Sequence, residues 1–403
     1  GEGKTLICIG PVCAGRTRKA SMAAVRILHL HSSFNLGGQE SRTVRLINHF
    51  GDQAEHTILS AVPDAFGAVD AIDKRIKFNL PKDAAPSLAG MPGMGRYRKL
   101  AAYMKKFHLV LSYNWGSMDG VMARTLLGQA MGLPPLIHHE DGFNHDEIER
   151  LKKRRNWFRT IALQRAHTLV VPSKTLEKIA RTQWHQPLDK ICRFPNGIDT
   201  DHYNRRPQRG SFPGFQKREG EIVVGTIAGL RTIKNLPRLV RAVAAAGPNI
   251  RLAIAGEGPE RAAIMAEAER LGMSDRVMMP GFLKDPSRYI RLFDIFALSS
   301  DSEQYPISLV EAMTSGIPAV STDVGDVRNM VSKENRPFIV GREDEAGLAN
   351  AISVLAQDAV LRSKVGDANR FIACSQYDEE TMFARYRQLY GSAMKRADFA
   401  RQA

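Results

Sequence analysis

The sequence predicts an α/β protein built from two doubly wound, parallel-sheet domains that face each other across a cleft. Three observations support this fold class. The 403 residues exceed what one compact core usually holds. Short apolar runs alternate with helical patterns along most of the chain, as expected for βαβ units. A polar, basic stretch with two prolines separates one such series from the next.

The composition places the domain boundaries. Met22 is a plausible native start, because the preceding residues do not fit the strand pattern and Gly1 to Thr5 resemble only the tail of a phosphate-binding loop. The expected divisions are an extension outside the fold at 1–21, a first domain at 22–204, a linker at 205–220, a second domain at 221–375 and a closing helical segment at 376–403.

The first domain opens with a buried strand at 25–30, followed by the Gly37-Gly38 turn and a helix. Glycine permits close backbone approach, and a free helix start attracts anions, so this turn is a candidate phosphate site. The alternative is a simple tight turn. Further strands are predicted at 56–62, 108–112, 136–138 and 169–171, and Ser173 is the predicted N-cap of the helix that follows the last one.

The second domain contains the most informative stretch, a strand at 295–298 followed by a polar loop and a helix at 307–314. Pro306 suits a helix start and Gly316 suits a helix end. Glu303 would lie in the loop at the carboxyl end of the strand, and Glu311 would lie in the helix. The alternative is that Glu303 caps the helix and Glu311 faces solvent. Other strands are predicted at 222–227, 251–255, near 277 and at 319–320.

The charge is uneven, with a net +12 in residues 1–200 and +3 in residues 201–403. A basic helix predicted at 147–165 also carries Trp157 and Phe158. This pattern favours an anionic partner, such as a lipid surface or a phosphorylated acceptor, although a solvated helix face is the alternative. Nucleic acid is disfavoured because no interleaved aromatic platform is present. A dinucleotide-dependent dehydrogenase is disfavoured because no strand precedes a full three-glycine fingerprint.

Five motifs occur in a specific order: 35–40, 195–199, 234–235, 256–259 and the Glu303/Glu311 pair. In this order the sequence resembles the retaining GT-B glycosyltransferases of family 4, from about Val25 to Val331. The resemblance implies two Rossmann-like domains, with the acceptor on the first and the nucleotide sugar on the second. It also implies that the tail helix crosses back to the first domain.

The resemblance implies roles for matching residues. Glu303 would hold donor-sugar hydroxyls, Glu311 the ribose hydroxyls, and Lys234 would neutralise the leaving diphosphate. Backbone of the glycine turn and of the helix start would contact phosphates, and backbone near 281–283 would contact the base. The predicted catalytic residues are Glu303, Lys234, Arg231, His139 and Asp141. The predicted donor-binding residues are Gly37, Gly38, Arg231, Lys234, Gly281, Phe282, Leu283, Glu303, Ile307, Ser308, Leu309 and Glu311.

Three departures from the family pattern concern the site. Gly229 stands where the family usually has an arginine, and Arg231 either reaches the phosphate from another angle or is a surface residue. Gln304 replaces the usual glycine after the first glutamate. Asp141 aligns best with the family's acceptor-loop histidine, with His138 and His139 just before it, and any of the three would position the acceptor hydroxyl unless its role is structural.

The resemblance therefore implies a hexosyltransferase that uses a UDP-, GDP- or ADP-sugar as co-substrate. We expect no tightly bound cofactor, and no metal dependence because no Asp-x-Asp motif stands out. The expected acceptor is lipid-linked or a saccharide, in bacterial surface polysaccharide or glycolipid synthesis. The four scattered cysteines favour a reducing, cytoplasmic location, and the basic first domain suggests a peripheral position at the inner face of the plasma membrane. The alternative activity is a nucleotide-sugar epimerase of the same architecture.

Overall fold

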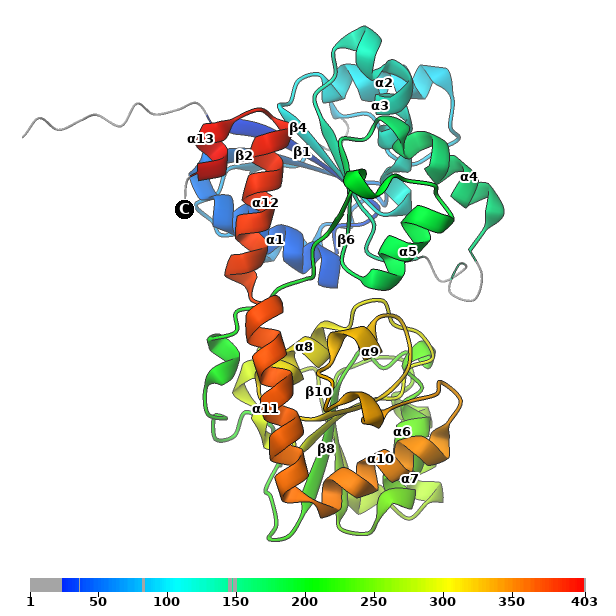
Figure 1. Ribbon diagram of the computed structural model, residues 1–403, viewed down its shortest axis with the longest axis vertical. Coiled ribbons are helices and arrows are strands. Elements are labelled where there is room, and N and C mark those ends of the chain that lie inside the picture. Colours follow the sequence, from blue (N-terminus) through cyan, green and yellow to red (C-terminus); the bar gives the residue numbers. More distant parts are fainter. Residues whose placement is uncertain (1–23, 36, 82–83, 144–146, 148–150, 402–403) are drawn as a thin grey trace, which may run out of the picture.

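Two α/β domains lie one above the other in the computed structural model, which describes residues 24–401 except 36, 82–83, 144–146 and 148–150 (Figure 1). The predicted extension at 1–21 therefore lies outside the described residues. Both sheets are parallel and carry helices on both faces, so the predicted fold class is confirmed. None of the helices in the described part of the chain combines the length and apolar character that a membrane span needs.

The first domain is organised on a seven-stranded sheet in the order β3-β2-β1-β4-β5-β6-β7. Its inner strand at Val25–His31 is buried on both faces: Ile27 packs into one hydrophobic cluster and Leu28 into another. Its strands are β1 (Val25–His31), β2 (Ala54–Ser60), β3 (Phe78–Asn79), β4 (Leu109–Tyr113), β5 (Leu136–His139), β6 (Thr168–Val171) and β7 (Ile191–Arg193). Its helices are α1 (Gly38–Phe50), α2 (Met94–Met104), α3 (Met118–Met131), α4 (Lys153–Ala162) and α5 (Lys174–Thr182).

The second domain has a six-stranded sheet in the order β10-β9-β8-β11-β12-β13. Its strands are β8 (Ile222–Ile227), β9 (Ile250–Ala255), β10 (Val277–Gly281), β11 (Ile295–Leu298), β12 (Ala319–Thr322) and β13 (Ile339–Val340). Its helices are α6 (Leu236–Ala246), α7 (Arg261–Arg270), α8 (Ile307–Thr314), α9 (Val327–Met330), α10 (Glu345–Gln357) and α11 (Ala359–Gln376). In such sheets ligands bind beyond the carboxyl ends of the strands, where the loops of the two domains meet.

The chain passes between the domains twice, and the two passages lie side by side. The Ile198 amide donates to the Tyr377 carbonyl over 2.9 Å, and the Glu379 amide donates to the Ile198 carbonyl over 2.9 Å. After the first passage the chain packs at once on the second domain, where Phe212 is 2% exposed in a core cluster. The segment 205–220 is therefore anchored to the second domain.

The last helices, α12 (Glu379–Ala393) and α13 (Ala397–Arg401), return to the first domain beside α1 (Figure 1). Met382, Phe383, Tyr386 and Tyr390 of α12 are buried in the same cluster as Ile27 of β1. Because this face is apolar, the C-terminal segment completes the core of the N-terminal domain and ties the two domains together.

Candidate active site

A cavity of about 450 Å³ lies between the domains, with walls from both. The first domain contributes Gly38, Gln39, Glu40, Asn114, Asp141, Gly142, Phe143 and Asn196. The second domain contributes Arg231, Glu303, Gln304, Tyr305 and Ile307. Five of the predicted site residues therefore line one cavity: Gly38, Asp141, Arg231, Glu303 and Ile307.

Two helix starts meet at this cavity. A Cβ placed on Gly38, at the start of α1, would lie 3.9 Å from Cγ1 of Ile307, at the start of α8. Neither helix has a side-chain N-cap hydrogen bond. The amide of Leu309 donates to the Pro306 carbonyl over 3.2 Å, so this predicted donor-binding residue does not offer a free amide. The tight first turn leaves the amides of Ile307 and Ser308 for an anionic ligand.

The wall from the second domain holds an ion pair. Lys234 Nζ lies 2.5 Å from Glu303 Oε1, and Ser300 donates to the same oxygen over 2.7 Å. Both side chains are largely buried, with Lys234 14% and Glu303 9% exposed. Lys234 ends a short 3-10 turn and is followed by Asn235 in the left-handed conformation, with φ 44°, as the N-cap of α6. This turn aims the lysine at the loop after β11, where Glu303 lies.

Arg231 lies over Gly229. A Cβ on Gly229 would be 3.6 Å from Nε of Arg231 and 4.0 Å from the carbonyl oxygen of Glu257. The guanidinium therefore occupies the space beside the position where the family usually carries its arginine. Arg231 is exposed, lines the cavity and forms no ion pair within the described part of the chain. It is available to an anion in the cleft.

Glu311 lies behind the start of α8 rather than on the cavity wall. Its Oε1 accepts a hydrogen bond of 2.7 Å from the hydroxyl of Tyr203, which follows the first interdomain passage. Burial raises the pKa of Glu311, while the Tyr203 hydrogen bond and nearby Arg45 oppose that rise. The carboxylate is thus held in one orientation by the segment that links the domains.

The remaining predicted donor contacts lie at the end of β10. Gly281 has φ 97°, and a Cβ there would come within 2.4 Å of Glu257 Oε1, so only glycine fits without a shift of that side chain. Phe282 is 65% exposed, and Leu283 packs against the domain core. Gly256 closes the neighbouring strand with φ 153°, directly against the carbonyl of Ala228. These glycines let the loops after β8, β9 and β10 lie close together.

The wall from the first domain is built on a buried arginine that sequence reasoning missed. Arg42 of α1 is 1% exposed and donates to Asp141 twice, over 2.5 and 2.8 Å. It also donates to Oδ1 of Asn196 over 2.6 Å. The amide of Asp141 donates to Asn114 Oδ1 over 2.8 Å. The only signal in the sequence was the position of Arg42, one turn into the helix that follows the Gly37-Gly38 turn.

His138 and His139 are buried behind this wall, at 0% and 1% exposure. The His139 ring stacks on Tyr113 at 4.6 Å, and its Nδ1 lies 3.2 Å from the Ser112 carbonyl oxygen, which fixes the proton on Nδ1. Burial, with Arg42 nearby, holds the pKa of His139 well below its usual range. Of the three residues considered for acceptor contact, Asp141 is the one on the cavity wall.

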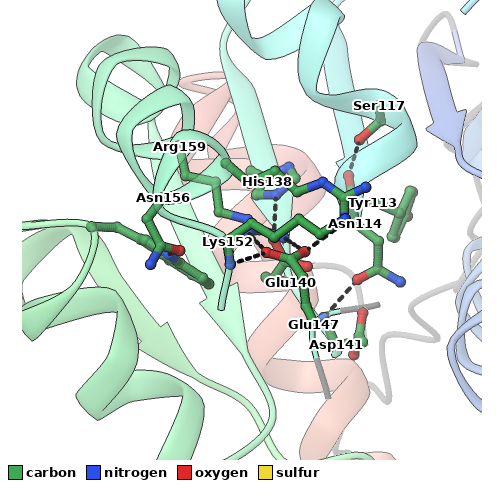
Figure 2. A network of polar contacts seen from close by, with 12 residues as sticks. Tyr113, Asn114, Ser117, His138, Glu140, Asp141, Glu147, Lys152, Asn156 and Arg159 are labelled. Carbon is green, nitrogen blue, oxygen red and sulfur yellow. Dashed lines mark hydrogen bonds and ion pairs between the residues drawn. The ribbon is translucent and has the colours of Figure 1, made fainter. Parts of the chain in front are cut away.

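Figure 2 shows a buried polar network next to the loop that carries Asp141. Arg159 of α4 is fully buried, with Nε 3.1 Å from Glu140 and Nη1 3.3 Å from Glu147. Its guanidinium also lies 5.0 Å from the ring centre of Trp115 and 5.1 Å from that of Trp184. Of the predicted helix at 147–165, residues 148–150 lie outside the described residues, and the structure has helix α4 at Lys153–Ala162 followed by a 3-10 turn at Leu163–Arg165. Arg159 of the predicted basic helix is therefore part of the core of the first domain.

Among the described residues, no group of three or more His, Cys, Asp or Glu side chains is placed to hold a metal ion.

Two parallel-sheet domains with a charged cleft between their strand ends define the GT-B class. Two family models match the chain: Glycosyltransferase Family 4 over residues 36–202 and Glycosyl transferases group 1 over residues 208–371. The chain therefore belongs to the GT-B glycosyltransferases of family 4.

Relatives and solved structures agree with this assignment. The N-acetyl-α-D-glucosaminyl L-malate synthase of Bacillus anthracis is 23% identical over 235 residues, which span 58% of either chain. The lipopolysaccharide core biosynthesis glycosyltransferase LpsE of Rhizobium meliloti is 28% identical over 159 residues, or 40% of this chain and 46% of LpsE. Anabaena HepE in complex with UDP shares the fold with a TM-score of 0.76 and 19% identity, covering 91% of this chain and all of HepE.

Proposed function

We propose that the protein transfers a hexose from a nucleotide sugar to a saccharide or lipid-linked acceptor, with retention of the anomeric configuration, in bacterial surface polysaccharide or glycolipid synthesis. The observation that carries this proposal is the position of the α8 helix start beside Arg231, which forms no ion pair within the described part of the chain. The free amides at the start of α8 and a guanidinium from another element of the second domain form a site for a diphosphate.

Lys234 and Glu303 would interact with different parts of the donor. Glu303 would accept hydrogen bonds from sugar hydroxyls, and Lys234 would shift its interaction toward the diphosphate as the glycosidic bond breaks. Because the two charges neutralise each other, neither carries the full cost of an unpaired buried charge. Glu311, held by Tyr203, would bind the ribose hydroxyls.

Relatives support the reaction class. HepE is described with UDP and with UDP-glucose, and LpsE is named for lipopolysaccharide core synthesis. LpsE is named as a glycosyltransferase, which does not favour the epimerase alternative.

The test is a donor screen followed by product analysis. UDP-, GDP- and ADP-sugars are first ranked by the rise in melting temperature that they cause. The best donor is then incubated with short saccharides and with lipid-linked saccharides, and proton NMR identifies the anomeric configuration of the product. Transfer with retention supports the proposal. Free epimerised donor, or a product of inverted configuration, contradicts it.

We propose further that helix α4 holds the first domain at an anionic membrane surface. Lys153 and Arg154 are exposed, and the indole of Trp157 is 66% exposed beside them. Basic side chains around an exposed tryptophan are typical of helices that lie in the headgroup region.

Co-sedimentation with vesicles tests this placement. The wild type should pellet with phosphatidylglycerol vesicles and remain in solution with phosphatidylcholine alone. The variant K153E/R154E/W157S should lose most of this binding. The control R205E/R206E, which reverses two exposed charges elsewhere, should keep it. Equal binding by both variants would refute the assignment to α4.

A further inference from the structure

The cavity between the domains contains three carboxylates, and two of them are already neutralised. Glu303 pairs with Lys234 over 2.5 Å, and Asp141 receives two hydrogen bonds from Arg42. The third is Glu40, in the first turn of α1, and no cation of the described residues forms an ion pair with it.

Neighbouring polar groups on the same wall are also occupied. Asn114 donates to Gln39 and accepts the amide hydrogen of Asp141, and Asn196 accepts from Arg42. The carboxylate of Glu40 instead folds back along its own helix start. A Cβ on Gly37 would lie 2.6 Å from its Oε2. Glu40 thus lines the cavity with a carboxylate to which no side chain of the described residues donates a hydrogen bond.

We propose that Glu40 binds the acceptor, with its carboxylate accepting a hydrogen bond from a hydroxyl of a neutral or amine-bearing sugar ring. This inference rests on the proposed transferase function and names the acceptor chemistry of the same cavity. Glu40 belongs to the first-domain wall, opposite Glu303 and Arg231, so it faces the donor site rather than forming part of it. An unpaired carboxylate there disfavours a phosphate or carboxylate close to the reacting hydroxyl.

In the transfer step the acceptor oxygen bonds to the anomeric carbon of the donor. The bond from that carbon to the diphosphate breaks, its electron pair stays on the diphosphate, and the hydroxyl proton passes to the diphosphate. Glu40 accepts its hydrogen bond from a neighbouring hydroxyl of the acceptor ring, so the proton of the reacting hydroxyl is free to pass to the diphosphate, and Glu40 is not consumed. The ionised carboxylate is the stronger hydrogen-bond acceptor, so its charge state affects binding.

The surroundings of Glu40 predict that acceptor use depends on pH. Burial raises the pKa of Glu40 to about 7, and the like charge of Asp141 adds to this, whereas its own backbone hydrogen bond and Arg42 oppose it. Across the cavity, Arg231 and the Lys234–Glu303 pair complete the charged groups that face it. Because the raised pKa lies near neutrality, acceptor use should rise with pH through this range as Glu40 ionises.

The experiment compares E40Q and E40D with E55Q, a control that removes an exposed carboxylate from β2. Donor affinity is measured by calorimetry with the best nucleotide sugar of the screen. Acceptor use is measured with methyl glycosides of glucose, galactose and N-acetylglucosamine, and with water in the acceptor position. Melting temperatures show whether replacement of Glu40 destabilises the start of α1.

E40Q should keep donor affinity within about twofold of wild type but lower kcat/KM for the probe acceptors by about 10- to 100-fold. It should also lose the rise of kcat/KM between pH 6 and pH 8, while E40D retains part of both properties. The proposal is overturned if E40Q matches E55Q, if donor affinity falls in parallel with acceptor use, or if the wild type binds donor but transfers to no probe. If the wild type binds no nucleotide sugar, the proposed function itself fails.

Discussion

Replacement of Arg231 by alanine should remove the cation that the cleft offers to the donor diphosphate. The structure also suggests how to restore it. Gly229 has ordinary, unstrained backbone, and a Cβ there meets only Arg231 Nε at 3.6 Å and the Glu257 carbonyl at 4.0 Å. When the arginine at 231 is removed, the space for a side chain at 229 opens. The double variant G229R/R231A can therefore place a guanidinium in the same region.

The expected loss follows from the role of the charge. A preorganised group that stabilises developing charge on the leaving diphosphate contributes about 2.7–4 kcal/mol, or about 10²- to 10³-fold in kcat. We expect R231A to lose activity in this range and G229R/R231A to regain at least about tenfold. The assay is steady-state release of the nucleoside diphosphate at saturating donor. R206A removes an exposed arginine without a partner among the described residues and controls for the change in net charge.

Two results would refute this reasoning. If R231A kept full activity, Arg231 would be a surface residue with no role at the phosphate. If R231A were inactive and G229R/R231A recovered nothing, the position of the charge over Gly229 would not be the relevant feature.

Two further predictions concern groups around the site. R159M should lower the free energy of unfolding by about 3–5 kcal/mol in urea denaturation, because it leaves the buried carboxylate of Glu140 without its arginine. R75A, at a side chain 88% exposed, should leave the free energy of unfolding nearly unchanged. Equal effects of the two variants would contradict the core role of Arg159. Y203F should raise the donor KM about 5- to 10-fold with kcat nearly unchanged, because Tyr203 only orients the ground-state contact of Glu311. A fall in kcat alone would contradict this.

The most local sequence signals predict the structure most accurately. The strand at 295–298 and the helix at 307–314 were predicted with the boundaries that the structure has. Pro306 and Gly316 determine those ends through backbone properties that need no knowledge of the rest of the fold. The short edge strands β3 and β7 have two and three residues, and so few residues carry no readable alternation.

Contacts between distant parts of the chain could not be predicted in the same way. Arg42 meets Asp141 across 99 positions, and nothing near Arg42 distinguishes it from a solvated helical arginine. Arg159 lies within the basic helix predicted at 147–165, although Glu140 and Glu147 pair with it in the core. In both cases the buried partner of the charge lies on another element, so its burial follows from tertiary packing and not from the local pattern.

The central claim is that the donor binds at the Lys234–Glu303 pair in the interdomain cavity. Single variants would leave a largely buried charge without its partner and would mix stability with binding. The double variant K234A/E303A removes both charges together and should keep the wild-type melting temperature within a few degrees. Calorimetric titration with the best nucleotide sugar should then show at least a 100-fold weaker Kd than for wild type. An unchanged Kd in a folded double variant would contradict the account and place the donor elsewhere.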